Sequence, residues 1–97
     1  MEKMTKNDYE YEYIKESALQ MLVLSFYIGD DDYHLSYYKE EKWAFYKGKE
    51  RLEIFENFEK ALTNIKVDNK TIYELLVIDK VEYGFTWYKD YLKNGIL

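Results

Sequence analysis

The sequence feature that most constrains this fold is a long, largely apolar stretch, Tyr9–Ile28 (YEYEYIKESALQMLVLSFYI). Within this stretch, a set of mostly apolar residues is spaced three or four positions apart, which is the spacing of one face of a helix. The residues on that face are Tyr11, Ile14, Ala18, Met21, Ser25 and Ile28. Further apolar residues in the second half predict burial on more than one side, so we expect a helix that continues to Ile28. A strand over Met21–Ile28 is the alternative, because this part is rich in residues that favour strands.

Both ends of this stretch carry residues typical of helix termini. Residues 1–7 are expected to be frayed, and Asn7 or Asp8 can accept hydrogen bonds from the first free backbone N–H groups of the helix. Gly29 is suited to end the helix. The carboxylates of Asp30–Asp32 cannot be buried together, so we expect a solvated loop there.

Three consecutive carboxylates also raise the question of a calcium site. Counted from Asp30, an EF-hand loop needs an oxygen-bearing side chain at its fifth place, Gly at its sixth and Glu at its twelfth. The chain has His34 and Leu35 at the first two of these places, and only Glu41 fits. The sequence therefore predicts no metal site here, and nothing in it suggests a cofactor.

Three segments further along alternate between apolar and polar residues, as strands do. They are Tyr33–Lys39, Lys42–Lys47 and Glu50–Phe55. Gly48 and Lys49 between the last two predict a two-residue turn, which fixes the register of this hairpin. The expected cross-strand pairs are Lys47 with Glu50, Phe45 with Leu52 and Trp43 with Ile54. A slip by one residue would move Glu53 to the apolar face, so the pattern favours this register.

The rest of the chain predicts short elements. They are a helix Phe58–Ile65 capped by Asn57, a turn Val67–Lys70, a helix opened by a Thr71–Glu74 capping box and running to Ile78, a strand Val81–Phe85 and a terminal helix Thr86–Asn94. All elements together predict one α+β domain over residues 1–97. We expect the N-terminal helix to pack on a small antiparallel sheet, a three-stranded meander, followed by short C-terminal helices.

Composition and charge narrow the classes of function that the chain can have. The chain has no Cys, which excludes disulfides and thiolate metal sites. Its formal net charge of −5 argues against simple affinity for nucleic acid or anionic membranes, and it fits a basic partner. Residues 2–16 alternate charges and tyrosines where a secretion signal would be apolar, and the run Ala18–Ile28 is too short to span a bilayer. We therefore expect a soluble, cytoplasmic protein.

Tyrosine is unusually frequent, with twelve residues. A tyrosine ring can fill the edge of a core, or it can form a binding surface for another protein or for a second copy of the chain. The sequence leaves both interpretations open, and with them a homo-oligomer.

The sequence offers little material for catalysis. A Ser nucleophile needs a well-placed His, and the single His of the chain, His34, is expected at the surface or at the edge of the core. No glycine-rich phosphate loop and no HExxH motif occur. We expect a protein that is not an enzyme.

Single-stranded nucleic acid is an alternative ligand, because the segment KEEKWAFYKGKER interleaves basic and aromatic residues. The expected hairpin register, however, directs Trp43 and Phe45 to the apolar face. Direct binding of nucleic acid is therefore the less favoured interpretation.

The favoured interpretation is an acidic surface that binds a basic or nucleic-acid-binding protein in place of its natural ligand. Such surfaces give fast, salt-sensitive association. The candidate contact residues are Asp30, Asp31, Asp32, Glu40, Glu41, Glu53, Glu56, Tyr37 and Tyr46. Loss of the charges at residues 30–32 is expected to slow association and to weaken its dependence on salt.

The segment FENFEKALTNIKVDNKTIYELL, with the hairpin before it, resembles a pattern in small acidic accessory proteins of phages and mobile elements of low-GC Gram-positive bacteria. In those proteins a hairpin leads into a short helix, and a turn then precedes a second one. The resemblance covers residues 42–80 and departs from the pattern at Asn69, where Gly is usual. It implies no catalytic residues. It implies inhibition of a host defence, as by anti-CRISPR proteins, or toxin immunity.

Overall fold

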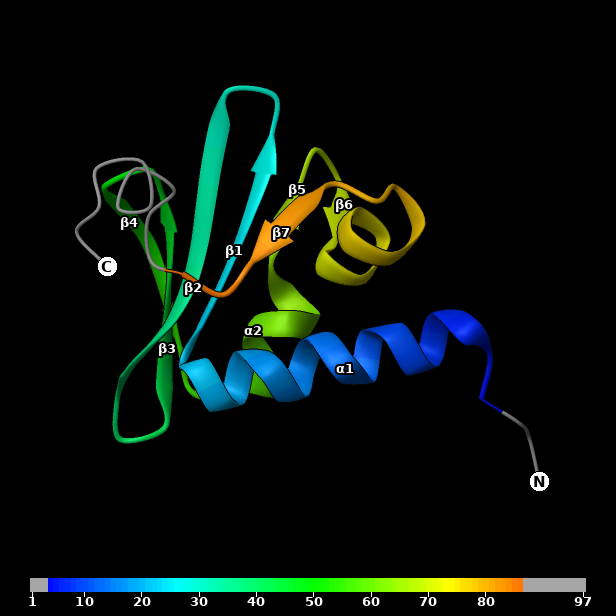
Figure 1. Ribbon diagram of the computed structural model, residues 1–97. Helices are drawn as coiled ribbons and strands as arrows, with labels where there is room; N and C mark the ends of the chain where they lie inside the picture. Colours follow the sequence, from blue (N-terminus) through cyan, green and yellow to red (C-terminus); the bar gives the residue numbers. More distant parts are fainter. Residues whose placement is uncertain (1–3, 87–97) are drawn as a thin grey trace.

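The computed structural model describes residues 4–86, which form an α+β fold. In chain order its elements are α1 (Lys6–Met21), β1 (Val23–Ile28), β2 (Asp31–Lys39), β3 (Lys42–Lys47), β4 (Glu50–Phe55), α2 (Phe58–Asn64), β5 (Lys66–Val67), β6 (Lys70–Thr71), the short π-helix η1 (Glu74–Ile78) and β7 (Glu82–Gly84). Five antiparallel strands form a sheet of order β4-β3-β2-β1-β7, and β5 pairs with β6. The N-terminal helix packs on the sheet and short helices follow later, as the sequence predicts (Figure 1).

The first helix is shorter than the sequence predicts. α1 ends at Met21, Leu22 adopts a left-handed conformation with φ of +62°, and Val23–Ile28 form β1. The predicted helix to Ile28 is therefore wrong, and the alternative strand is correct. β1 lies between β2 and β7, and four of its side chains, on both faces of the sheet, are buried. Such a central strand lacks a polar face, so its sequence resembles that of a buried helix.

The N-cap of α1 is Thr5 rather than Asn7 or Asp8, although Asp8 accepts a backbone hydrogen bond at the helix start as predicted. The Oγ1 atom of Thr5 accepts a hydrogen bond from the backbone N–H of Asp8 (3.1 Å), and the Oδ2 atom of Asp8 accepts one from the N–H of Thr5 (2.9 Å). Because this capping box satisfies two free N–H groups, the helix begins at Lys6. The expected fraying is wrong for residues 5–7, and residues 1–3 lie outside the described range.

The expected loop Asp30–Asp32 is also wrong, because a turn of Gly29 and Asp30 alone connects β1 to β2. The next two aspartates belong to β2 and lie opposite Ile28 and Tyr27. Gly29 has φ of +61°, which supplies the left-handed conformation that a two-residue hairpin turn requires. The chain therefore reverses direction before most of the acidic run.

The three strands of the predicted meander are present as β2, β3 and β4, and the register of the last two is partly as predicted. The observed pairs are Lys47 with Glu50, Phe45 with Glu53 and Trp43 with Phe55. The first pair is correct, and the other two are shifted by one residue because β4 contains a β-bulge. The shift buries Phe55 and leaves Leu52 and Ile54 partly exposed at the sheet edge. Bulges are common in edge strands because they twist the edge away from further pairing.

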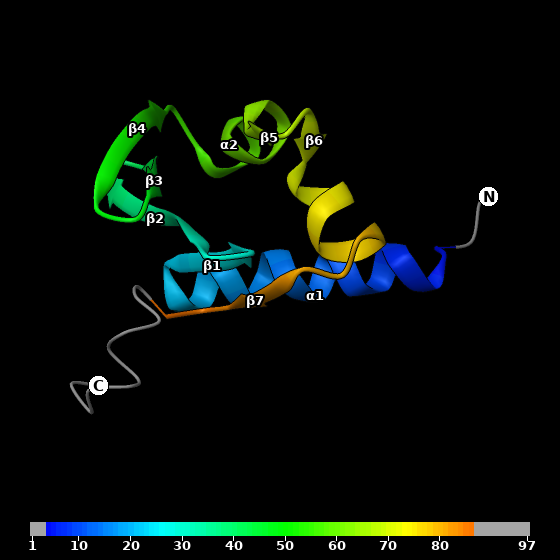
Figure 2. The same cartoon turned by 90° about the horizontal axis from the view of Figure 1, so that it is seen from above.

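The core lies on the side of the sheet that carries the helices. The rings of Phe26, Tyr33 and Phe45, from three adjacent strands, stack on one another with centroids 5.3–6.2 Å apart. Figure 2 shows that the sheet curves around α2 and η1, and Figure 1 shows β1 rising at a steep angle from the end of α1. The helices contribute Ile14, Ala18, Phe58, Ala61, Leu62, Leu75, Leu76 and Val77 to the core.

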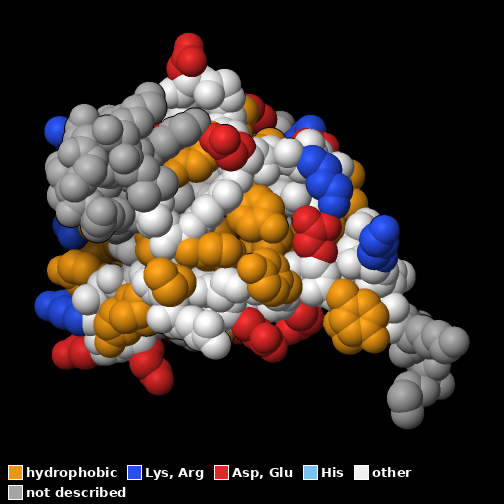
Figure 3. Space-filling model, in the orientation of Figure 1, with side chains coloured by type: hydrophobic (Ala, Val, Ile, Leu, Met, Phe, Trp, Pro, Cys, Tyr) orange, Lys and Arg blue, Asp and Glu red, His pale blue; other side chains and the backbone are white. Residues whose placement is uncertain are grey.

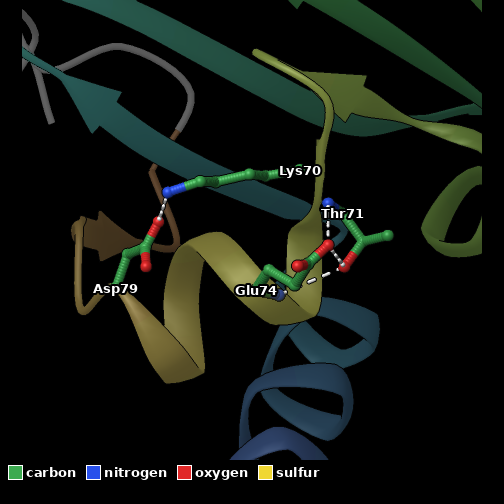
Figure 4. A network of polar contacts seen from close by, with 4 residues as sticks. All are labelled: Lys70, Thr71, Glu74 and Asp79. Atoms are coloured by element: carbon green, nitrogen blue, oxygen red, sulfur yellow. Dashed lines mark hydrogen bonds and ion pairs between the residues drawn. The ribbon is translucent and has the colours of Figure 1, made fainter.

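Local polar contacts start both later helices as the sequence predicts. The side chain of Asn57 accepts a hydrogen bond from the N–H of Lys60 (2.8 Å) at the start of α2. At the start of η1, the side chain of Thr71 accepts from the N–H of Glu74 (3.2 Å), and the carboxylate of Glu74 accepts from the N–H of Thr71 (3.1 Å) (Figure 4). Figure 4 also shows Lys70 reaching past the helix to Asp79.

The predicted last strand is confirmed as β7, which pairs with β1. The predicted helix Thr86–Asn94 lies outside the described residues, apart from its first residue. Among residues 4–86, no helix has the length and apolar character needed to cross a membrane.

Candidate functional site

An open pocket of about 490 Å³ lies where the end of α1, the β2–β3 turn and the start of α2 meet. Its volume is within the range of about 300–1,000 Å³ that is usual for ligand sites. The lining residues are Leu19, Leu22, Tyr37, Glu41, Trp43, Asn57, Phe58 and Glu59. We call this set of residues the groove.

Aromatic rings form the floor of the groove. Trp43 and Phe58 are almost fully buried, and their ring centroids lie 4.7 Å apart. Tyr37 stands edge-on to Trp43 with centroids 6.2 Å apart, and it is 40% exposed. At the rim, Leu19 and Leu22 are about half exposed. A buried aromatic floor inside an exposed apolar rim is typical of sites where a partner protein anchors a side chain.

Exposed hydrophobic residues also occur along α1, where their spacing places them on more than one side of the helix. Figure 3 shows hydrophobic side chains gathered along α1 and toward the tip of the β2–β3 hairpin, where acidic side chains project beside them. The exposed hydrophobic residues on and directly after α1 are Tyr9, Tyr13, Leu19, Met21 and Leu22. The apolar surface thus extends beyond the groove itself.

Two carboxylates stand at the groove on separate elements. Glu41 belongs to the β2–β3 turn, and Glu59 belongs to the first turn of α2. Neither has an ion-pair partner within residues 4–86. Burial raises the pKa of the Tyr11 hydroxyl on α1 to about 12, and the negative charges of Glu59 and Glu12 add to this shift. The potential in the groove therefore favours a cation.

The backbone beside the groove adopts conformations that disfavour the residues found there. Leu22, Glu40 and Glu41 have φ of +62°, +50° and +69°. The left-handed region costs a residue other than Gly about 1–2 kcal/mol. The turn Asp68-Asn69 has a similar left-handed backbone, but its residue types tolerate that conformation. The residues at the groove are therefore not those that fold stability would select.

The structure divides the predicted contact residues between the two ends of β2. Tyr37 and Glu41 line the groove, and Glu40 precedes Glu41 in the same turn. Glu56 lies nearby, next to Asn57, in an ion pair of 3.2 Å with Lys60. Glu53 lies apart on the exposed edge strand β4. The groove thus brings together part of the predicted set.

The remaining predicted residues, Asp30–Asp32 and Tyr46, lie toward the opposite end of β2, which we call the aspartate end. The nine residues of β2 separate the two ends by about 25–30 Å. Asp31 Oδ2 lies 4.0 Å from the Nζ atom of Lys47, and Asp32 contacts His34. Tyr46 is half-buried, opposite Arg51 and His34. At this end most of the carboxylates have partners within the chain.

His34 is fully buried, so the expectation of a surface or core-edge residue is wrong. Its Nε2 atom lies 3.0 Å from Asp32 Oδ2, and its Nδ1 atom lies 3.0 Å from Ser25 Oγ. Because the carboxylate can only accept, neutral His34 carries its proton on Nε2 and accepts through Nδ1. Ser25 shares its hydroxyl proton between His34 and the carbonyl oxygen of Thr86. Burial lowers the pKa of His34, and the contact with Asp32 opposes this shift.

Ser25, His34 and Asp32 have the residue types of a hydrolytic triad, but their placement is that of a structural network. Ser25 has no exposed area, and its hydroxyl faces the Thr86 carbonyl rather than a cleft. A nucleophile must reach its substrate, so we interpret these contacts as a clasp that holds β1, β2 and the chain at Thr86 together.

The chain matches no protein-family model, no curated protein and no solved structure. The groove is therefore the feature of the described residues that bears most on function. Within residues 4–86, no group of three or more His, Asp or Glu side chains is placed to hold a metal ion.

Sequence reasoning missed several groove residues. Leu22 is inside the expected helix, and nothing in the sequence shows that the chain turns there. Trp43 is buried, as its predicted place on the apolar face of the hairpin implies, but burial alone does not reveal that it also lines a pocket. The His34 network had a detectable signal, because Asp32 is two residues away and therefore on the same face of a strand.

Proposed function

We propose that this chain is a non-enzymatic inhibitor or modulator that binds another protein through the groove. Its partner presents a basic surface, as nucleic-acid-binding proteins do. This is the manner of action of the phage and mobile-element accessory proteins, anti-CRISPR proteins among them, that its sequence resembles.

The observation that carries the proposal is the combination of exposed apolar residues and unfavourable backbone at one place. Leu22 is half exposed and has a left-handed backbone, although Gly is the usual residue at that position after a helix. A leucine there exposes apolar surface and adds strain, so the fold alone does not account for it. Residues that lower stability at one site are expected where that site has a function.

The charge at the groove indicates the kind of partner. Glu41 and Glu59 border the groove, Glu40 adjoins it, and the whole chain carries a net charge of −5. A basic partner would be steered to this surface, and its association would slow as salt increases.

Direct binding of single-stranded nucleic acid has less support. Stacking of bases requires exposed aromatic faces, whereas Trp43 and Phe45 are 3% and 5% exposed. A homo-oligomer through the tyrosines remains the other candidate, because Tyr9 and Tyr13 are more than 60% exposed. Light scattering distinguishes it by a mass above 11.9 kDa.

The test is affinity capture from a lysate of low-GC Gram-positive cells, with the wild-type chain and three variants as bait. Tyr37→Ala and Leu22→Asn remove groove contacts, and Asn tolerates the left-handed backbone of residue 22. Tyr9→Ala is the matched control, because it removes an exposed tyrosine at the other end of α1.

The expected result is one dominant protein that wild type and Tyr9→Ala retain at low salt, and that both groove variants lose. The same protein should elute from wild type at high salt. Retention by all four baits would show that binding does not use the groove. Capture of nucleic acid alone would overturn the proposal in favour of the nucleic-acid module.

A further inference from the structure

We propose that the groove receives an arginine side chain of the partner, with the guanidinium group held between Glu41 and Glu59. This inference rests on the proposed function and adds the chemistry of the residue that is recognised.

Two carboxylates border the groove. Glu41 and Glu59 come from the β2–β3 turn and from α2, elements that are distant in sequence, yet both line one pocket. Neither is neutralised by a cation within the described part of the chain. A single cationic group that enters the pocket from solvent is attracted by both carboxylates.

The groove also presents an exposed aromatic ring, that of Tyr37. A guanidinium group stacks on aromatic faces and remains charged at all relevant pH values. Of the rings that line the pocket, Tyr37 is 40% exposed, whereas Trp43 and Phe58 are almost fully buried, so Tyr37 is the ring on which a guanidinium can stack. Lysine lacks the planar group that can donate to two carboxylates while it stacks, and for that reason we favour arginine.

The rim of the groove fits the aliphatic part of the same occupant. Leu19 and Leu22 at the rim offer apolar surface on the α1 side of the pocket. The aliphatic stem of an arginine can lie along such surface while its charged end reaches the carboxylates. A leucine one helical turn away in the partner would cover the remaining rim, since residues four apart share one face of a helix.

The experiment uses two alanine-based peptides of twelve residues. The first carries Leu and Arg four positions apart, and the second has citrulline, which is isosteric with arginine but uncharged, in place of Arg. Binding is followed by NMR titration of the full chain, with the indole N–H of Trp43 as the reporter. We expect a dissociation constant on the order of 0.1–1 mM for the arginine peptide. The citrulline peptide should bind about five- to tenfold more weakly.

Three variants locate the charge. Glu41→Gln and Glu59→Gln should each weaken binding of the arginine peptide by about two- to fivefold. Glu50→Gln is the matched control, because Glu50 adjoins the Gly48-Lys49 turn, near the aspartate end. It should leave the dissociation constant unchanged.

Equal affinity for the arginine and citrulline peptides would overturn the proposal, as would wild-type affinity in both groove glutamine variants. Two further results distinguish a failure of the arginine inference from a failure of the proposed function. If a captured partner is lost by Tyr37→Ala but retained by the Glu41→Gln/Glu59→Gln double variant, the groove binds protein and the arginine inference is wrong. If the arginine peptide binds as expected but no captured protein depends on the groove, the pocket is as described and the proposed function is wrong.

Discussion

The two ends of β2 carry the same kind of charge but differ in how the chain uses it. At the aspartate end, Asp32 contacts the buried His34, and Asp31 lies near Lys47. At the groove end, Glu41 has no ion-pair partner within residues 4–86, and Glu40 lies 4.0 Å from Lys42. Asp32 at one end is engaged by a buried side chain of the fold, whereas Glu41 at the other end faces an open, largely apolar pocket.

Backbone geometry shows the same difference. The turn at the aspartate end has Gly29 in its left-handed position, which a glycine adopts without strain. The turn at the groove end places two glutamates in left-handed conformations, and Leu22 beside it adopts a third. The two turns therefore differ, with a favourable residue at the aspartate end and unfavourable ones at the groove end; Lys80, with φ of +59°, is a further unfavourable residue away from the groove. Predictions that separate stability from binding can test this contrast.

The largest expected effect is on stability at the aspartate end. His34→Ala removes a buried ring and leaves Ser25 and Asp32 without their shared partner. Cavity formation and a lost buried hydrogen bond together should lower the free energy of unfolding by about 2–4 kcal/mol. Urea denaturation followed by circular dichroism measures this change. Lys39→Ala, at an exposed position of the same strand, should change stability by less than about 0.5 kcal/mol, and equal losses in both variants would contradict the structural role of His34.

The sequence predicts the fold class and most elements, because their signals are local. Alternation defines β2 to β4, and the Asn57 and Thr71 caps define the later helices. The helix-to-strand change at Leu22 cannot be predicted in this way. It depends on β1 being enclosed by β2 and by β7, whose residues come some sixty positions later, and such pairing leaves no local pattern.

The candidate site is predictable in part for a related reason. Charged and aromatic residues can be read from the sequence, and so Glu40, Glu41 and Tyr37 are among the predicted contacts. Folding determines which acidic side chains have partners within the chain. Asp32, for example, contacts His34, which in turn contacts Ser25. A bulge in β4 is equally invisible in the alternation pattern, since one extra residue is absorbed without a change of composition.

The next effect concerns the groove end, where stability and binding should change in opposite directions. Replacing Glu40-Glu41 by Asn-Gly supplies the residues that this turn favours, so the free energy of unfolding should rise by about 1–2 kcal/mol. Binding of the captured partner should weaken by about two- to fivefold, because the carboxylate of Glu41 is lost. Thermal unfolding and titration calorimetry measure the two changes.

The matched control for that variant is the turn Asp68-Asn69. Its residues already tolerate left-handed backbone, so replacing them by Asn-Gly should raise stability by less than about 0.5 kcal/mol and leave binding unchanged. If the Glu40-Glu41 variant were no more stable than wild type, the turn would not be strained, and this part of the argument for function would fail.

A smaller effect is the pH dependence of stability at the aspartate end. Burial lowers the pKa of His34 below its usual 6.5, so the unfolded chain binds a proton at a higher pH than the folded one. The stability contributed by neutral His34 is complete above pH 6.5 and is lost as the pH falls below that value toward the folded pKa. The slope cannot exceed about 1.4 kcal/mol per pH unit.

Urea midpoints measured between pH 5 and 8 test this dependence. His34→Gln keeps a polar side chain at the position but does not titrate, and carboxylates common to both proteins cancel in the difference. The difference in unfolding free energy between wild type and His34→Gln should therefore shrink as the pH falls below 6.5. A difference that stays constant across this range would show that His34 does not change its protonation on unfolding.

The smallest expected effect is the removal of charge from the two exposed aspartates, and it separates the ends of β2 most directly. Asp30 and Asp31 are exposed, and the 4.0 Å contact of Asp31 with Lys47 lies in solvent, where such pairs contribute about 0–1 kcal/mol. The free energy of unfolding of the double variant Asp30→Asn/Asp31→Asn should therefore lie within about 0.5 kcal/mol of the wild-type value.

Binding should change little as well. Because both residues lie about 25–30 Å from the groove, beyond the Debye length of about 8 Å at physiological salt, the affinity for the captured partner should change by less than about twofold. The sequence alone predicts a larger loss of association rate for this variant. Stopped-flow association of this variant and of Glu41→Gln, measured at two salt concentrations, therefore decides between an extended acidic surface and the groove as the binding site. A greater decrease in association rate for the aspartate variant would favour the extended surface.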